Sequence, residues 1–130
     1  MPTPTDAMLK LGEQAEELGD LSGRLADVSR KLEPVEREYT DFVDNHELGL
    51  WNRSEDEDGF KLPSAAIRLK LAHQAMPPEL LGRYKGLVES RSRLVQRIRD
   101  LKAEIEAQRS ILSALKVEME ASGSGMRRAA

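Results

Sequence analysis

The chain has 130 residues, enough for one domain, and 33% of them are charged while only 4% are aromatic. This balance is typical of long exposed helices rather than of a globule with a thick core. The absence of cysteine excludes a disulfide framework, a thiolate nucleophile and a cysteine metal site. No apolar run approaches the roughly 18 residues of a membrane span, and the first residues lack a signal-peptide pattern. We therefore expect a cytoplasmic protein with no membrane partner.

Charge is distributed unevenly along the chain. Residues 1–60 hold 6 Lys or Arg and 16 Asp or Glu, whereas residues 61–102 hold 10 and 3. One interpretation is that an acidic helix pairs with a basic one in an antiparallel hairpin. The other is that the basic segment binds an anionic partner such as nucleic acid. The two interpretations are compatible.

A first long helix is predicted over about residues 6–46, with Thr5 or Asp6 as its N-cap. Pro34 removes a backbone donor, but the apolar repeat continues through it, so we expect one kinked helix. Steps of three and four residues keep one stripe facing a partner helix, as in a coiled coil. We call this stripe the first seam. Its positions are Ala7, Leu11, Gln14, Leu18, Leu21, Leu25, Val28, Leu32, Val35, Tyr39, Phe42 and His46.

The repeat breaks over residues 47–63, where Gly49, an acidic run and Gly59 predict a loop. Trp51 and Phe60 bracket this segment, so we expect aromatic packing to pin the loop at both ends. A short helix over residues 64–75 is predicted next. Ser64 is its N-cap, and its one-face residues are Ile67, Leu71 and Gln74.

A second long helix is predicted over residues 78–121, with Pro78 in its first turn. The second-seam positions are Leu80, Tyr84, Leu87, Arg91, Leu94, Ile98, Leu101, Ile105, Gln108, Leu112, Leu115 and Met119. The fold class is all-α: an elongated helical hairpin or coiled coil forming a single domain over residues 1–121. Residues 122–130 are expected to be a flexible tail.

A homo-oligomer larger than a dimer is predicted because Leu81, Val88 and Val95 widen the second stripe beyond what one hairpin can bury. Whether the arms pair within one chain or between chains is left open by the sequence. The expected oligomer-interface residues are Leu81, Val88, Val95, Leu94, Ile98, Leu101 and Ile105.

Catalytic chemistry has few candidate residues, and we do not expect an enzyme, a cofactor or a metal site. Of the two histidines, His46 is expected to pack or cap in the first seam, and His73 to be solvated at a helix end. The acidic run at residues 55–58 lacks the alternating ligand spacing and distal Glu of a calcium loop.

A nucleic-acid-binding surface is predicted from the basic segment. Arrayed around a ring of subunits, its side chains would form a positive belt able to track phosphates, with Trp51 as a stacking platform. The predicted binding residues are Trp51, Lys61, Arg68, Lys70, Arg83, Lys85, Arg93, Arg97, Arg99 and Lys102.

The order of elements, together with LWNRSEDEDGF at residues 50–60 and the basic short helix that follows Lys61 and Ser64, resembles the UvsY family of phage recombination mediators. In that family's pattern a Lys-x-Arg pair precedes the aromatics, and Asn45 and Glu47 stand in those places here. The resemblance implies an all-helical protein that binds single-stranded DNA as a ring-like homo-oligomer. It also implies that the protein helps a RecA-type recombinase to displace the single-strand-binding protein.

The alternative function belongs to another class. A coiled-coil structural or adaptor protein, such as an assembly scaffold, would explain both seams without any affinity for nucleic acid.

Overall fold

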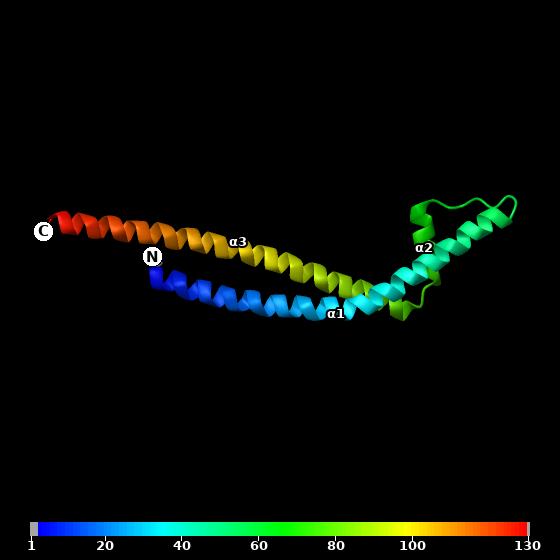
Figure 1. Cartoon of the computed structure of the whole chain (residues 1–130), viewed down its shortest axis with the longest axis horizontal. Helices are drawn as coiled ribbons and strands as arrows, with labels where there is room; N and C mark the ends of the chain where they lie inside the picture. The colour runs from blue at the N-terminus through cyan, green and yellow to red at the C-terminus, as the bar shows by residue number, and fades with distance from the viewer. Residues whose placement is uncertain (1–2, 130) are drawn as a thin grey trace. The chain divides into compact units, whose positions relative to one another are not determined.

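The computed structural model describes residues 3–129, with side chains described for residues 3–122. It contains α1 (Pro4–Asp56), α2 (Ala65–Ala75) and α3 (Pro78–Ala129), drawn in order from blue to red in Figure 1. The two long helices pack antiparallel, and α2 connects them, so the predicted all-α hairpin is confirmed. Ser122, where the sequence predicts the start of a flexible tail, still belongs to α3; the rest of the predicted tail, residues 123–130, lies outside the residues whose side chains are described and stays a prediction.

The start of α1 is a capping box formed by Thr3 and Asp6. The Asp6 backbone N–H donates to Thr3 Oγ1, and the Thr3 backbone N–H donates to Asp6 Oδ2, both at 3.1 Å. Pro4 stands at the first helical position, where its missing N–H removes no helix bond. The helix therefore begins two residues before the position that the sequence predicted, because Thr3 rather than Thr5 or Asp6 is the cap.

α1 is one continuous helix through Pro34, as predicted, and it also continues beyond the predicted end. Residues 47–56, which were predicted to be loop, are helical, so that prediction is wrong over this stretch. Gly49 costs only about 1 kcal/mol in a helix interior, and its neighbours include good helix formers. The chain reverses instead at Gly59, whose φ of +85° is a left-handed conformation that glycine adopts freely.

The ends of α2 and the start of α3 agree with the sequence. Ser64 Oγ accepts a hydrogen bond from the Ile67 backbone N–H, and Met76 closes α2 with its N–H on the Ala72 carbonyl. α3 then starts at Pro78, as predicted. The sequence predicts that Ile67 lies on the apolar face of α2, but Ile67 is 52% exposed. The buried residue of α2 is Ala72.

Contacts divide the helices into two compact units, which are described separately. Unit 1 joins the residues up to Ala26 with those from Arg93 onward, and unit 2 spans Asp27–Ser92. In unit 1 the start of α1 lies alongside the C-terminal half of α3 (Figure 1). Its core consists of Leu21, Leu101 and Ile105, with more seam residues packed around them: Leu11, Leu18, Leu94 and Ile98.

In unit 2 the buried apolar residues come from α1, α2 and the residue after α2. Leu32 and Val35 of α1 are buried, together with Ala72 of α2 and Met76. In unit 1 the seam residues of α1 and α3 pack on each other, and in unit 2 the rings of Tyr39 and Tyr84 stack between the two long helices. This answers the question that the sequence left open, because the arms pair within the chain.

Candidate nucleic-acid interface

The structure distributes the predicted binding residues over both units. Unit 2 holds Trp51, Lys61, Arg68, Lys70, Arg83 and Lys85, and unit 1 holds Arg93, Arg97, Arg99 and Lys102. The predicted surface is therefore considered as two separate groups.

Arg68 is the centre of a cluster that joins three segments of unit 2. Its Nε donates to Glu47 Oε1 at 3.0 Å, and one terminal nitrogen donates to the Pro63 carbonyl at 2.7 Å. Its guanidinium carbon lies 5.6 Å from the centre of the Trp51 ring. We call these four residues, Glu47, Trp51, Pro63 and Arg68, the Arg68 clasp. Since the Arg68 side chain is only 16% exposed, it stabilises the fold of unit 2 and has little surface left for a phosphate.

The loop between α1 and α2 is held by a second arginine. Arg53 stacks over the Phe60 ring at 4.4 Å and forms an ion pair with Glu57 at 2.9 Å. Phe60 holds the loop as expected, but through a guanidinium group instead of aromatic packing, whereas Trp51 lies within α1 and contacts Arg68 of α2. No local sequence pattern predicts this arrangement, because Arg53 is 7 residues from Phe60 and Arg68 is 17 residues from Trp51.

The other predicted binding cations of unit 2 are exposed to solvent. Lys61, Lys70, Arg83 and Lys85 are exposed, and among the described residues none of them forms an ion pair within the chain. Lys70 follows Arg68 by two residues in α2, so its side chain points to a different side of the helix from the Arg68 contacts. Trp51 itself is 47% exposed, so part of its surface remains open.

Unit 1 uses one of its predicted binding residues for its own fold. Arg97 bridges to Glu17 of α1 at 2.7 Å and to Glu104 of α3 at 3.4 Å. The hydrogen bond to Glu17 raises the pKa of the Arg97 guanidinium, with the charge of Glu17 adding to it. Arg99 and Lys102 are exposed. At Arg97 the basic part of α3 thus pairs with the acidic α1, as the hairpin interpretation of the charge asymmetry predicts. Other cations remain at the surface.

The sequence missed a polar cluster in unit 2. The Tyr39 hydroxyl lies 2.7 Å from His73 Nε2, and the Tyr39 ring stacks on Tyr84. His73 is half-buried by this contact, so the expectation of a solvated histidine is wrong. Burial, with a smaller contribution from Tyr84, raises the pKa of Tyr39 above its usual 10.0. His46 is half-buried and stacks near Phe42, which confirms its expected role in side-chain packing.

The predicted oligomer-interface residues fall into two classes. Leu94, Ile98, Leu101 and Ile105 belong to the core of unit 1 and pack on α1 of the same chain. Leu101 has no exposed surface, so it is not available to a second subunit in this conformation. Leu81, Val88 and Val95 are half-buried.

Neither a metal centre nor a membrane span is found in the part of the chain that the structure describes. No group of three or more His, Cys, Asp or Glu side chains gathers there as metal ligands do. None of the described helices combines the length and apolarity needed to cross a bilayer.

Comparison with family models, curated proteins and solved structures finds no match to this chain. The likeness to the recombination mediators therefore rests on the sequence features of residues 50–64 and on the order of the helices.

Proposed function

We propose that this protein binds single-stranded DNA as a homo-oligomer and assists the loading of a RecA-type recombinase. The observation that carries the proposal is that unit 2 combines a partly open Trp51 with exposed lysines, Lys61 and Lys70, that make no ion pair within the described chain. An aromatic face among unpaired cations is the combination that holds single strands, because bases stack on the ring while the cations meet phosphates. The resemblance to the mediator family supports the same function.

The proposal is tested by fluorescence anisotropy of a labelled single-stranded oligonucleotide at low salt. Wild-type protein should bind with little sequence preference, and its affinity should fall steeply as salt rises because each neutralised phosphate releases a counterion. Replacing Lys61, Lys70 and Lys85 together by Gln should weaken binding at least ten-fold, since these side chains make no ion pairs within the described chain.

The matched control replaces three exposed cations outside the predicted surface by Gln: Lys10, Arg24 and Lys116. Both variants remove the same charge, so equal losses of affinity would mean that binding depends on net charge alone. No binding by wild-type protein at low salt would refute the proposal.

A coiled-coil adaptor or assembly scaffold is the second candidate. Two observations favour it: Arg68 and Arg97 are engaged within the chain, and α2 leaves Ile67 and Leu69 exposed to solvent. An adaptor would bury such apolar side chains against a partner protein. It would show no gel shift with single-stranded oligonucleotides.

A further inference from the structure

Asp58 and Gly59 form the reverse turn between the end of α1 and the segment that leads to α2. The Phe60 backbone N–H donates to the Glu57 carbonyl across this turn at 3.3 Å. Gly59 is the one described residue with a positive φ, +85°, so the φ of Asp58 is negative. These signs define a type II turn, with Asp58 in its second position and Gly59 in its third. Both residues lie outside the helices and are exposed to solvent.

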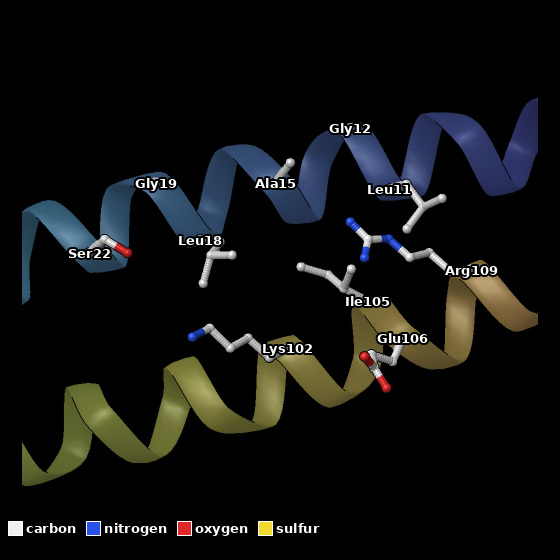
Figure 2. A pocket seen from close by; sticks show the side chains of 10 residues that line it. All are labelled: Leu11, Gly12, Ala15, Leu18, Gly19, Ser22, Lys102, Ile105, Glu106 and Arg109. Carbon is white, nitrogen blue, oxygen red and sulfur yellow. The ribbon is translucent and has the colours of Figure 1, made fainter.

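This pairing of residue types and backbone occurs once in the chain. Asp58 is the only aspartate that precedes a glycine, and every other aspartate lies within α1 or α3. In a helix the backbone nitrogen after an aspartate is bonded to a carbonyl of the preceding turn, and the dihedral angles are fixed. Glycine does not change this inside a helix: Gly12 and Gly19 lie in regular turns of α1, beside the groove of unit 1 that Figure 2 shows.

The Gly59 nitrogen is open to attack the neighbouring carboxyl group. Its N–H forms no hydrogen bond with another described residue. Glycine has no side chain to shield the nitrogen, and a Cβ added at Gly59 would meet no atom of another part of the chain within 4 Å. Nothing around Gly59 therefore blocks the approach of the nitrogen to the Asp58 carboxyl group.

The turn must open before the two groups meet. In a closed type II turn the second residue has a ψ of about +120°, which directs its side chain away from the next nitrogen. The hydrogen bond that closes this turn is 3.3 Å long, beyond the usual range of about 2.7–3.2 Å for such bonds. Exposed turns with few and weak bonds open at little cost in free energy. Asp58 therefore visits the conformation that its helical counterparts are denied.

We propose that Asp58 is a modification site, at which the chain converts aspartate to isoaspartate. The Gly59 nitrogen bonds to the side-chain carbon Cγ of Asp58. The carboxyl group loses one oxygen as water, which takes one proton from the nitrogen and one from solvent. A cyclic imide results, in which the Gly59 nitrogen is bonded to both carbonyl carbons of Asp58.

Water then opens the imide at one of its two carbonyl carbons. Addition at Cγ restores aspartate, whereas addition at the main-chain carbon breaks the original peptide bond. In the second product the chain runs through Cβ and Cγ, and the former main-chain carbonyl becomes a free carboxylate. Water is the only co-reactant, and either route introduces one oxygen atom from it. The new carboxylate is the group that isoaspartyl carboxyl methyltransferases methylate.

The modified turn has one more carbon atom in its main chain. The Phe60 N–H and the Glu57 carbonyl are then no longer held in the spacing of a type II turn. Both of these residues are also contacted by Arg53, which stacks on the Phe60 ring and pairs with Glu57. The modification therefore acts on the segment that joins α1 to α2.

The test keeps the full chain for weeks at neutral pH and physiological temperature in water enriched in the heavy oxygen isotope. Trypsin then releases residues 54–61, which Arg53 and Lys61 delimit, and electron-transfer fragmentation distinguishes isoaspartate from aspartate. Isoaspartate and heavy oxygen should accumulate at residue 58 at least ten-fold faster than at any other aspartate. Methyl transfer to the chain by an isoaspartyl methyltransferase should rise in parallel. An unmodified Asp58, after a time in which the chain unfolded in denaturant converts, would overturn the proposal.

Two variants are matched controls, with helicity checked by circular dichroism. Asp58→Glu keeps the charge but requires a larger ring, which closes far more slowly, so it should lose the methyl-acceptor signal. Lys85→Asp creates an aspartate before Gly86 at an exposed position inside α3. This second Asp–Gly pair should convert at least ten-fold more slowly than Asp58 in the same chain, because the helix fixes its backbone. Equal conversion at the two positions, or a methyl-acceptor signal that survives Asp58→Glu, would overturn the proposal.

Discussion

The rings of Tyr39 and Tyr84 stack with their centroids 3.8 Å apart and their planes 8° from parallel. The two residues occupy the seams of α1 and α3, so their contact fixes the axial register of the long helices in unit 2. The Tyr39 hydroxyl also reaches His73 of α2. One side chain therefore links all three helices of this unit.

Tyr39→Phe should lower the free energy of unfolding by about 0.5–1.5 kcal/mol. The variant keeps the stacked ring and loses only the hydroxyl that lies 2.7 Å from His73 Nε2. Urea unfolding at one fixed protein concentration measures the change. Tyr84→Phe is the matched control and should have a smaller effect. A loss for Tyr84→Phe as large as that for Tyr39→Phe would mean that the bond to His73 contributes little.

Leu101→Ala should destabilise the protein by about 2–5 kcal/mol, the range for a large-to-small change in a core. Leu101 has no exposed surface and sits with Leu21 and Ile105 at the centre of unit 1. Thermal and urea unfolding monitored by circular dichroism measure the loss. Val117→Ala on the same helix, at a residue that is 64% exposed, should change stability by less than about 0.5 kcal/mol. Similar effects of the two substitutions would contradict the core as described.

The first turn of α1 should loosen in acid. Hydrogen bonds from the Thr3 backbone and side chain lower the pKa of Asp6 below its usual 3.8 in the folded chain. A carboxyl whose folded pKa is depressed stabilises the fold above its unfolded pKa, and this contribution is lost as the pH falls through the folded pKa. NMR titration of the Asp6 carboxyl should show the low pKa. Thr3→Ala removes the hydroxyl and keeps the backbone N–H, so the pKa should rise only part of the way toward 3.8; an unchanged pKa in that variant would mean that the Thr3 hydroxyl contributes nothing to the shift.

Trp51→Ala should reduce the affinity for single-stranded DNA by about 1–3 kcal/mol if a base stacks on the ring. Trp51→Phe keeps an aromatic face and should retain most of the binding. Phe60→Ala is a useful comparison because Arg53 already stacks on that ring. Anisotropy titrations at one salt concentration separate the three variants. Unchanged affinity in Trp51→Ala would limit this residue to its role in the Arg68 clasp.

The seams were the most predictable part of the fold. Every first-seam position is buried or half-buried, and in the second seam only Met119 is exposed. A period of 3.5 residues reports directly which side of a helix is covered, so the sequence carries this information locally. The helix starts at Ser64 and Pro78 were predictable for the same reason, since caps act over three or four residues.

The end of α1 and the contacts of Arg68 were not predictable in this way. The sequence segment 47–56 contains Gly49 and several polar residues, and these lower helix propensity without ending the helix. Arg68 finds Glu47 at a sequence separation of 21 residues, and His73 finds Tyr39 at 34. Such pairs depend on how α2 folds back on α1, which no local pattern specifies. Their consequence for the predicted interface is that Arg68 stabilises the fold instead of facing solvent.

The Arg68 clasp contains the only tryptophan of the chain. Indole emission from the unlabelled protein therefore originates at a single known place, where the loop and α2 meet α1. Release of the guanidinium from the ring would change the polarity around the indole without any change in helix content. The wavelength of that emission is a built-in optical signal for the docking of α2, separable from unfolding of the long helices.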